Sequence, residues 1–225
     1  MNIRRFFLWS VLASSGVLLG CATPVARDYS AWQQAKPATL LVLPPVNDSP
    51  EVKATPGTWA STTLPLAEAG YYVLPVTLVD ETLRQNGVTT AEDAHAIPAP
   101  KLREVFGADA AVYIRIKQYG TKYAVVASDT RVELEARIVD LKTGASLWEG
   151  TAAASSSEGQ NSQGSLAALL IKALVNQVVG TATDAAYTYA GMAGTRLLGA
   201  PRFNGVLPGP RSPLYGQPPP GPGSR

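Results

Sequence analysis

The chain has 225 residues, of which 46% are hydrophobic and 16% charged, a composition typical of a protein with a buried core rather than a disordered chain. Its single cysteine, Cys21, allows no internal disulfide, and its single histidine, His95, excludes zinc sites that need two histidines. The formal net charge of +2 depends on Arg4 and Arg5, because without them the 17 acidic residues are balanced by basic ones.

The N-terminus is typical of a secretion signal. Arg4 and Arg5 precede an uncharged, mainly apolar run at 6–19, which is shorter than the roughly 20 residues that a bilayer span requires. The run ends in Leu-Leu-Gly-Cys, which resembles the lipobox of bacterial lipoproteins. The resemblance implies cleavage between Gly20 and Cys21 and attachment of lipid, with acyl chains such as palmitate, to Cys21. The alternative is an unmodified cysteine behind an ordinary signal peptide.

The composition along the chain predicts four segments: a lipoprotein signal peptide at 1–20, a lipidated tether at 21–37, a single α/β domain at 38–199 and a disordered tail at 200–225. The tether lacks a sustained apolar period and could reach roughly 50 Å when extended. Tyr29 and Trp32 are candidates for docking on the domain. The tail holds eight Pro and five Gly in 26 residues, which predicts no packed structure.

The first half of the domain alternates strands and helices. Thr39–Leu43 is a continuous apolar run, as in strands that are buried on both faces. Further patterns predict a helix at 58–69 that Pro65 interrupts and a second strand at 71–75. Two more helices, each followed by a glycine, are predicted at 77–85 and 101–106. This alternation favours an α/β layer.

The second half changes to a two-residue period. Apolar and polar side chains alternate at 112–117 and 131–138, which predicts antiparallel strands with one polar face, and a third strand follows at 146–153. Leu166–Met192 should form a long, mostly buried helix. The predicted fold class is therefore α/β (α+β), with one mixed sheet in which strand–helix alternation precedes antiparallel strands and a long C-terminal helix.

The sequence offers little support for catalysis. Glu133 and Glu135 share one strand face, as glycosidase carboxylates could, but cross-strand ion pairs with Arg115 and Lys117 explain these charges more simply. His95 has no evident serine or cysteine partner and is expected to be structural. No phosphate loop, dinucleotide fingerprint or nucleophile motif occurs, so we expect no catalytic residue, no metal and no cofactor. Basic and aromatic residues do not interleave, which argues against nucleic-acid binding.

Two short segments are candidates for binding a partner or a ligand. Asn47 and Asp48 follow the first predicted strand, at the end where open α/β sheets usually bind. Tyr71 and Tyr72 form an aromatic pair, for which one core ring and one surface ring is the commoner arrangement.

Six motifs stand out when they are taken together, at 41–49, 65–73, 79–81, 106–110, 119–121 and 139–144. In combination they resemble a lipoprotein family of unknown function that includes a Neisseria genome-derived lipoprotein antigen. The resemblance is close over Tyr29–Gly150 and looser over the following helix. It implies a fold similar to the N-terminal domain of TolB, the propeller protein of the Tol system, and it supplies no catalytic residues.

The resemblance also implies a location and a role. It implies an outer-membrane lipoprotein that faces the periplasm, and Ala22 in place of aspartate after the lipidated cysteine favours the same membrane. Family genes are commonly grouped with one for a curli-secretion-pore-like lipoprotein, which implies envelope protein partners. The leading hypothesis is a lipid-anchored, non-enzymatic accessory or scaffold of an envelope assembly or transport complex, with a homo-oligomer possible. The alternatives are a periplasmic small-ligand binding module and a hydrolase acting on envelope polymers.

Overall fold

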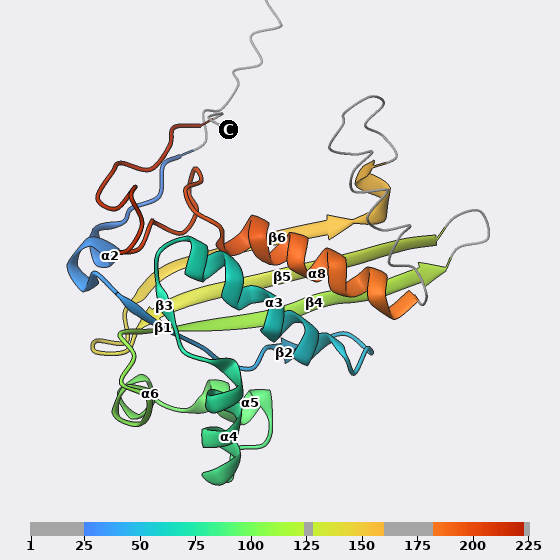
Figure 1. The fold of residues 1–225 in the computed structure, drawn as a ribbon, viewed down its shortest axis with the longest axis horizontal. Helices are drawn as coiled ribbons and strands as arrows, with labels where there is room; N and C mark the ends of the chain where they lie inside the picture. The colour runs from blue at the N-terminus through green and yellow to red at the C-terminus, as the bar shows by residue number, and fades with distance from the viewer. Residues whose placement is uncertain (1–24, 124–127, 160–181, 223–225) are drawn as a thin grey trace, which may run out of the picture.

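The computed structural model describes residues 25–123, 128–159 and 182–222, which fold around one sheet of six strands (Figure 1). The strands are Thr39–Val42 (β1), Val46–Asn47 (β2), Tyr72–Val73 (β3), Ala110–Tyr123 (β4), Ser128–Asp140 (β5) and Ser146–Ser155 (β6). Their order is β3-β1-β4-β5-β6, with β2 paired to β4. The pairs that include β1 or β2 are parallel, whereas β4, β5 and β6 are antiparallel.

Helices pack on both sides of this sheet. They are Ser30–Ala35 (α2), Ala54–Glu68 (α3), Val76–Gln85 (α4), Ala91–Ala96 (α5), Ala99–Phe106 (α6) and Ala182–Leu198 (α8), and a 3₁₀ turn covers Ser156–Gly159 (η1). Helices α3 and α8 contact one another across one face of the sheet, and α4, α5 and α6 gather beside β1 and β3 (Figure 1).

The hydrophobic pattern of the strands explains this architecture. Leu40, Leu41 and Val42 are fully buried because β1 lies between β3 and β4 with helices on its faces. In β4 the alternation separates the buried Ile114 from the exposed Arg115. The predicted fold class, one mixed sheet with parallel strands first and antiparallel strands later, is confirmed.

Helix α3 runs without interruption through Pro65, where the sequence predicts a break. Pro65 is buried, and its carbonyl accepts a hydrogen bond from Ala69 N at 3.0 Å. The facing helix α8 approaches closely, because a Cβ added at Gly194 would lie 3.4 Å from the Thr62 side chain. This packing, with the fully buried Leu66, offsets the backbone hydrogen bond that proline cannot donate.

The residues expected to form a tether are packed on the domain from Val25 onward. Helix α2 lies in this segment, and Tyr29 and Trp32 are only 7% and 4% exposed. The Trp32 ring meets Tyr71 edge-on, with ring centroids 6.3 Å apart. The docking expected of Tyr29 and Trp32 is therefore observed, and the described fold includes residues 25–37, which the sequence assigned to a tether.

The prediction of a disordered tail is wrong for residues 200–222. Gly209 N donates to Ala69 O at 2.7 Å, and the Tyr71 hydroxyl donates to Leu207 O at 2.6 Å. The tail has few apolar side chains of its own, which is why its composition predicts disorder. It is ordered because its backbone both donates hydrogen bonds to and accepts hydrogen bonds from groups elsewhere in the fold, including the tyrosine hydroxyls.

Close approach of the tail depends on Gly70. This residue has a φ of 95°, and a Cβ at this position would overlap Ser212. Gly70 O accepts a hydrogen bond from Arg211 N at 3.1 Å, and Val206 is 1% exposed. The chain after α8 is therefore part of the folded domain.

Most of the long helix predicted at Leu166–Met192 falls within 160–181, outside the described residues. The part that is described, α8, continues past Met192 to Leu198. The helix packs on the sheet, and its Ala190 and Ala193 are fully buried. Across the described part of the chain, no helix combines the length and the apolar character that a membrane span needs.

Asp109 ties the start of β1 to the start of β4. Its carboxylate accepts hydrogen bonds from Ala38 N, Thr39 N and the Thr39 hydroxyl, at 3.0, 3.0 and 2.8 Å. Burial raises the pKa of Asp109, but these hydrogen bonds and the charge of Arg103 together lower it below its ordinary value.

Replacing Asp109 by asparagine should lower the free energy of unfolding at neutral pH, and the difference from the parent should shrink in acid. Because the folded-state pKa is lowered, the stabilisation is complete above the ordinary aspartate pKa of about 4 and is lost as the pH falls through the folded-state value. Denaturant unfolding over this pH range measures the effect. A difference that is constant with pH would contradict it, and the exposed ion-pair variant Asp80→Asn should change stability little.

Candidate functional site

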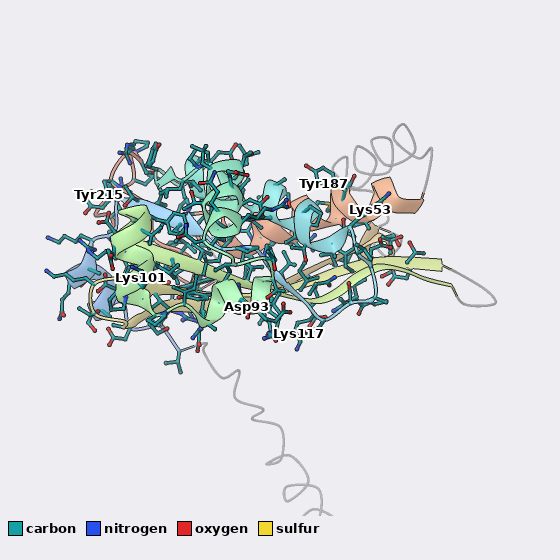
Figure 2. All side chains as sticks on the ribbon, turned by 90° about the horizontal axis from the view of Figure 1, so that it is seen from below. Lys53, Asp93, Lys101, Lys117, Tyr187 and Tyr215 are labelled. Atoms are coloured by element: carbon teal, nitrogen blue, oxygen red, sulfur yellow. The ribbon has the colours of Figure 1, made fainter. Side chains whose placement is uncertain are left out.

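One face of β4, β5 and β6 carries polar side chains, which we call the open face. The strand register aligns Tyr113 with Arg137 and Glu149, and Arg115 with Glu135 and Thr151, so that these six residues share one side of the sheet. Figure 2 shows Lys117 and Asp93 on this side, opposite Tyr187 of α8 and Lys53 before α3. Within the described residues, α3 and α8 therefore cover the other side.

A pocket of about 520 Å³ lies on the open face. Besides the open-face residues, it is lined by Arg27 from the N-terminal segment and His95 from α5. The Arg27 guanidinium carbon is 5.7 Å from the centroid of the Trp148 ring in β6. The pocket thus extends from β6, beside the N-terminal segment, to α5 on the other side of β4.

Tyr113 forms the centre of the pocket. The Arg137 guanidinium carbon lies 4.5 Å from the Tyr113 ring centroid, a cation–π distance, and the His95 ring meets the same ring edge-on at 5.2 Å. Burial raises the pKa of the Tyr113 phenol, and the charge of Arg137 opposes this only in part. The phenol is therefore protonated at neutral pH and can donate or accept a hydrogen bond.

His95 is held against the chain that follows β1. Its Nε2 lies 3.0 Å from the carbonyl of Pro44. Burial lowers the pKa of the imidazole, whereas the hydrogen bond to Pro44 raises it, and the net shift is downward. The neutral ring must then carry its hydrogen on Nε2 to donate to the carbonyl.

Asp48 binds the two basic residues of β4, which corrects the expected ion pairs. Arg115 and Lys117 donate to the two Asp48 carboxylate oxygens at 2.7 and 3.1 Å, instead of pairing with Glu133 and Glu135. The hydrogen bond from Lys117, joined by Arg115, lowers the pKa of Asp48 although desolvation opposes it. The sequence pattern missed β2, which pairs with β4 and brings Asp48 to these cations.

Glu133 itself pairs with Arg131 on its own strand, at 3.0 Å. Glu135 lies opposite Arg115 in the strand register and lines the pocket. Within the described residues, the ion pairs do not include Glu135. The carboxylate pair considered for glycosidase chemistry is therefore divided between an ion pair and the pocket wall.

The four residues predicted for binding do not form one site. Asn47 closes its own loop, because its side chain accepts from Ser49 N at 2.9 Å and donates to Glu51 O at 2.9 Å. Tyr71 and Tyr72 lie on and beside β3, the edge strand that pairs with β1, whereas Asn47 lies in β2, which pairs with β4.

Tyr71 is 4% exposed and Tyr72 is 51% exposed, which confirms the expected division into a core ring and a surface ring. Of the four predicted residues, Asp48 is the one connected to the open face, through its ion pair with Arg115.

Arg27, Tyr113 and Arg137 are among the pocket residues that the sequence did not single out. The alternation in β4 and β5 already places Tyr113 and Arg137 on a polar face, so pairing the two strands in register could have found them. Arg27 could not be found in this way, because its place depends on the packing of the N-terminal segment.

The pocket wall carries groups that can bind charged or planar parts of a partner. It combines three guanidinium groups, two carboxylates and an aromatic ring, which suit charged and planar groups of a partner. The neutral His95 donates to a backbone carbonyl and has no serine or cysteine beside it in the pocket wall. In the described ranges, no group of three or more histidine, cysteine or acidic residues could hold a metal ion.

Comparison with known proteins gives the family. A family model described as "Putative lipoprotein GNA1162-like" matches residues 27–211. The lipoprotein NMB1124/NMB1162 of Neisseria meningitidis serogroup B is 45% identical over 206 residues, which are 89% of this chain and 95% of the relative.

Two solved structures are similar to this chain. The crystal structure of lipoprotein GNA1162 from Neisseria meningitidis is 46% identical, with a TM-score of 0.53, and the match covers 64% of this chain and all of that one. A PelC dodecamer from Paraburkholderia phytofirmans is 11% identical over 78% of this chain and 90% of its own, with a TM-score of 0.41. On the family model and the 45% identical relative, the chain belongs to the GNA1162-like lipoprotein family.

Proposed function

We propose that this protein is a lipid-anchored, periplasm-facing outer-membrane lipoprotein that acts as a non-enzymatic accessory or scaffold in an envelope assembly or transport complex. The observation that carries the proposal is the open face with its pocket of charged side chains, on a domain that belongs to a lipoprotein family. The partner class that the family resemblance implies includes a curli-secretion-pore-like lipoprotein.

The composition of the open face supports binding to a protein. Arginine and tyrosine are enriched among residues that contribute most to protein interfaces, because both combine a large flat surface with hydrogen-bonding groups. Tyr113 and Arg137 are already stacked in the pocket, so little side-chain entropy is lost when a partner covers them. A face that binds in this way needs no catalytic group.

The anchor is proposed at Cys21, after removal of residues 1–20. Cys21→Ser should abolish the incorporation of labelled palmitate and release the protein from the membrane fraction, because serine offers no sulfur for the thioether. Metabolic labelling followed by fractionation measures both effects. Unchanged labelling and fractionation would contradict the anchor, and Ser30→Ala, beyond the cleavage region, should leave both as in the parent.

A periplasmic small-ligand binding module is the second candidate, and the volume of the pocket favours it. A cavity of about 520 Å³ lies within the range that holds small molecules. A thermal-shift screen of anionic envelope metabolites tests it, because a ligand that binds the folded state raises the unfolding temperature. Stabilisation that survives in Arg137→Ala would place the ligand outside the pocket.

A further inference from the structure

The N-terminal segment is fixed to the domain from its first described residue. The Asn204 side chain donates to Val25 O at 2.9 Å and accepts from Arg27 N at 2.8 Å, so it clamps this segment from both sides. Two residues further on, the Tyr29 hydroxyl donates to Gly205 O at 2.5 Å. Movement at Val25 would therefore require these tail contacts to break.

The chain between this clamp and the proposed lipid is short. Only residues 22–24 separate Cys21 from Val25, so their Cα atoms can be at most about 15 Å apart. The predicted tether of residues 21–37 would have allowed roughly 50 Å. A lipid on Cys21 holds that residue at the headgroup level of the bilayer, and the clamp must then lie close to the same surface.

The surface around the clamp suits a bilayer interface. Val25 is 87% exposed, Arg202 is exposed, and Phe203 is partly exposed, so both chain segments that the clamp joins present groups of this kind to solvent. Arginine binds lipid phosphates, and exposed apolar side chains enter the headgroup boundary. The Arg202 guanidinium already donates to Arg196 O at 3.1 Å, which directs its position.

We propose that this clamp surface, consisting of Val25, Arg27, Arg202, Phe203 and Asn204, docks on phospholipid headgroups and gives the domain a fixed orientation on the membrane. The inference rests on the proposed lipidation of Cys21. In Figure 1 the blue start of the described chain lies at the end of the molecule opposite α4. The β6 side of the sheet is therefore near the bilayer, and α4 points away from it.

This orientation has a consequence for the pocket. Arg27 belongs both to the clamp surface and to the pocket wall, so the pocket opens beside the headgroups. A partner that reaches it must approach along the membrane rather than from the open periplasm.

Energy transfer to a labelled bilayer tests the orientation. The lipidated protein is reconstituted in phosphatidylethanolamine–phosphatidylglycerol vesicles that contain a headgroup-labelled acceptor, with a donor on Ala26→Cys or on Gln85→Cys. Both positions are exposed. The single native cysteine, Cys21, carries the proposed lipid, so the introduced cysteine is the one free thiol for labelling. Transfer should be at least about twofold lower from position 85, because a domain of this size is roughly 40 Å across.

A flexible insertion provides the matched control. Twenty Gly/Ser residues inserted after Pro24 add a root-mean-square reach of about 25 Å, so transfer from position 26 should fall towards that from position 85. Equal transfer from the two positions without the insertion, in protein that still floats with the vesicles, would overturn the orientation and leave the anchor intact. Failure to float would overturn the anchor and the orientation together.

Discussion

Ending the chain after Arg202 should lower the free energy of unfolding by on the order of 5 kcal/mol. The deletion removes the buried Val206 and leaves donors without acceptors, among them the hydroxyls of Tyr29 and Tyr71. Each lost hydrogen bond to a buried donor costs about 1–3 kcal/mol, and burial of one apolar side chain contributes a similar amount. Denaturant unfolding of the full and shortened chains measures the difference.

A shorter deletion is the matched control for this experiment. Removing residues 217–225 retains the hydrogen bonds that Gly205, Leu207 and Gly209 make with the body of the domain, so the free energy of unfolding should change by less than about 1 kcal/mol. If the longer deletion were equally neutral, the tail would not be part of the fold.

Replacing Trp148 by alanine is the second substitution with a large expected effect. Trp148 is 3% exposed, its Nε1 donates to Asn204 O at 3.0 Å, and Arg27 lies over its ring. The ring also fills the space beside Gly150, where an added Cβ would lie 2.5 Å from a ring carbon. Loss of a buried aromatic ring costs about 3–5 kcal/mol, so we expect a decrease of that size.

The same substitution should loosen the clamp on the N-terminal segment. Hydrogen exchange at the amides of Arg27 and Gly205 should accelerate in Trp148→Ala more than at Ile114 in the centre of β4. Trp148→Phe retains most of the ring and loses the Nε1 hydrogen bond, so its cost should be about 1 kcal/mol. Equal destabilisation by alanine and phenylalanine would show that the hydrogen bond, rather than the ring, dominates.

The parts of the fold that the sequence predicts correctly depend on local periodicity. The apolar run at Leu40–Leu43 and the alternation through Ile114 and Arg115 determine which strands are buried on both faces and which have a polar face. The tail could not be predicted in this way, because its order depends on residues far away in the chain. Tyr29 and Tyr71 supply hydrogen bonds that its own composition does not reveal.

The candidate site shows the same division. The sequence predicts one core ring and one surface ring for Tyr71 and Tyr72, and a polar face on the antiparallel strands, and the structure confirms both. It assigns Arg115 to the wrong partner, because the two-residue strand β2 is too short to leave a pattern. The position of Arg27 in the pocket follows from the clamp by Asn204, a contact across 177 residues.

The most direct test of the proposed function is photocrosslinking in living cells from the open face. A photoreactive amino acid at Thr151, which is exposed and lines the pocket, should form adducts with one or a few envelope proteins. The same probe at Gln85 of α4 should form few, because that helix is at the far end from the clamp surface. Adducts specific to position 151 that disappear in Arg137→Glu are the predicted result. Adduct patterns that are the same at both positions, or no adduct above background at Thr151, would contradict an accessory role through the open face.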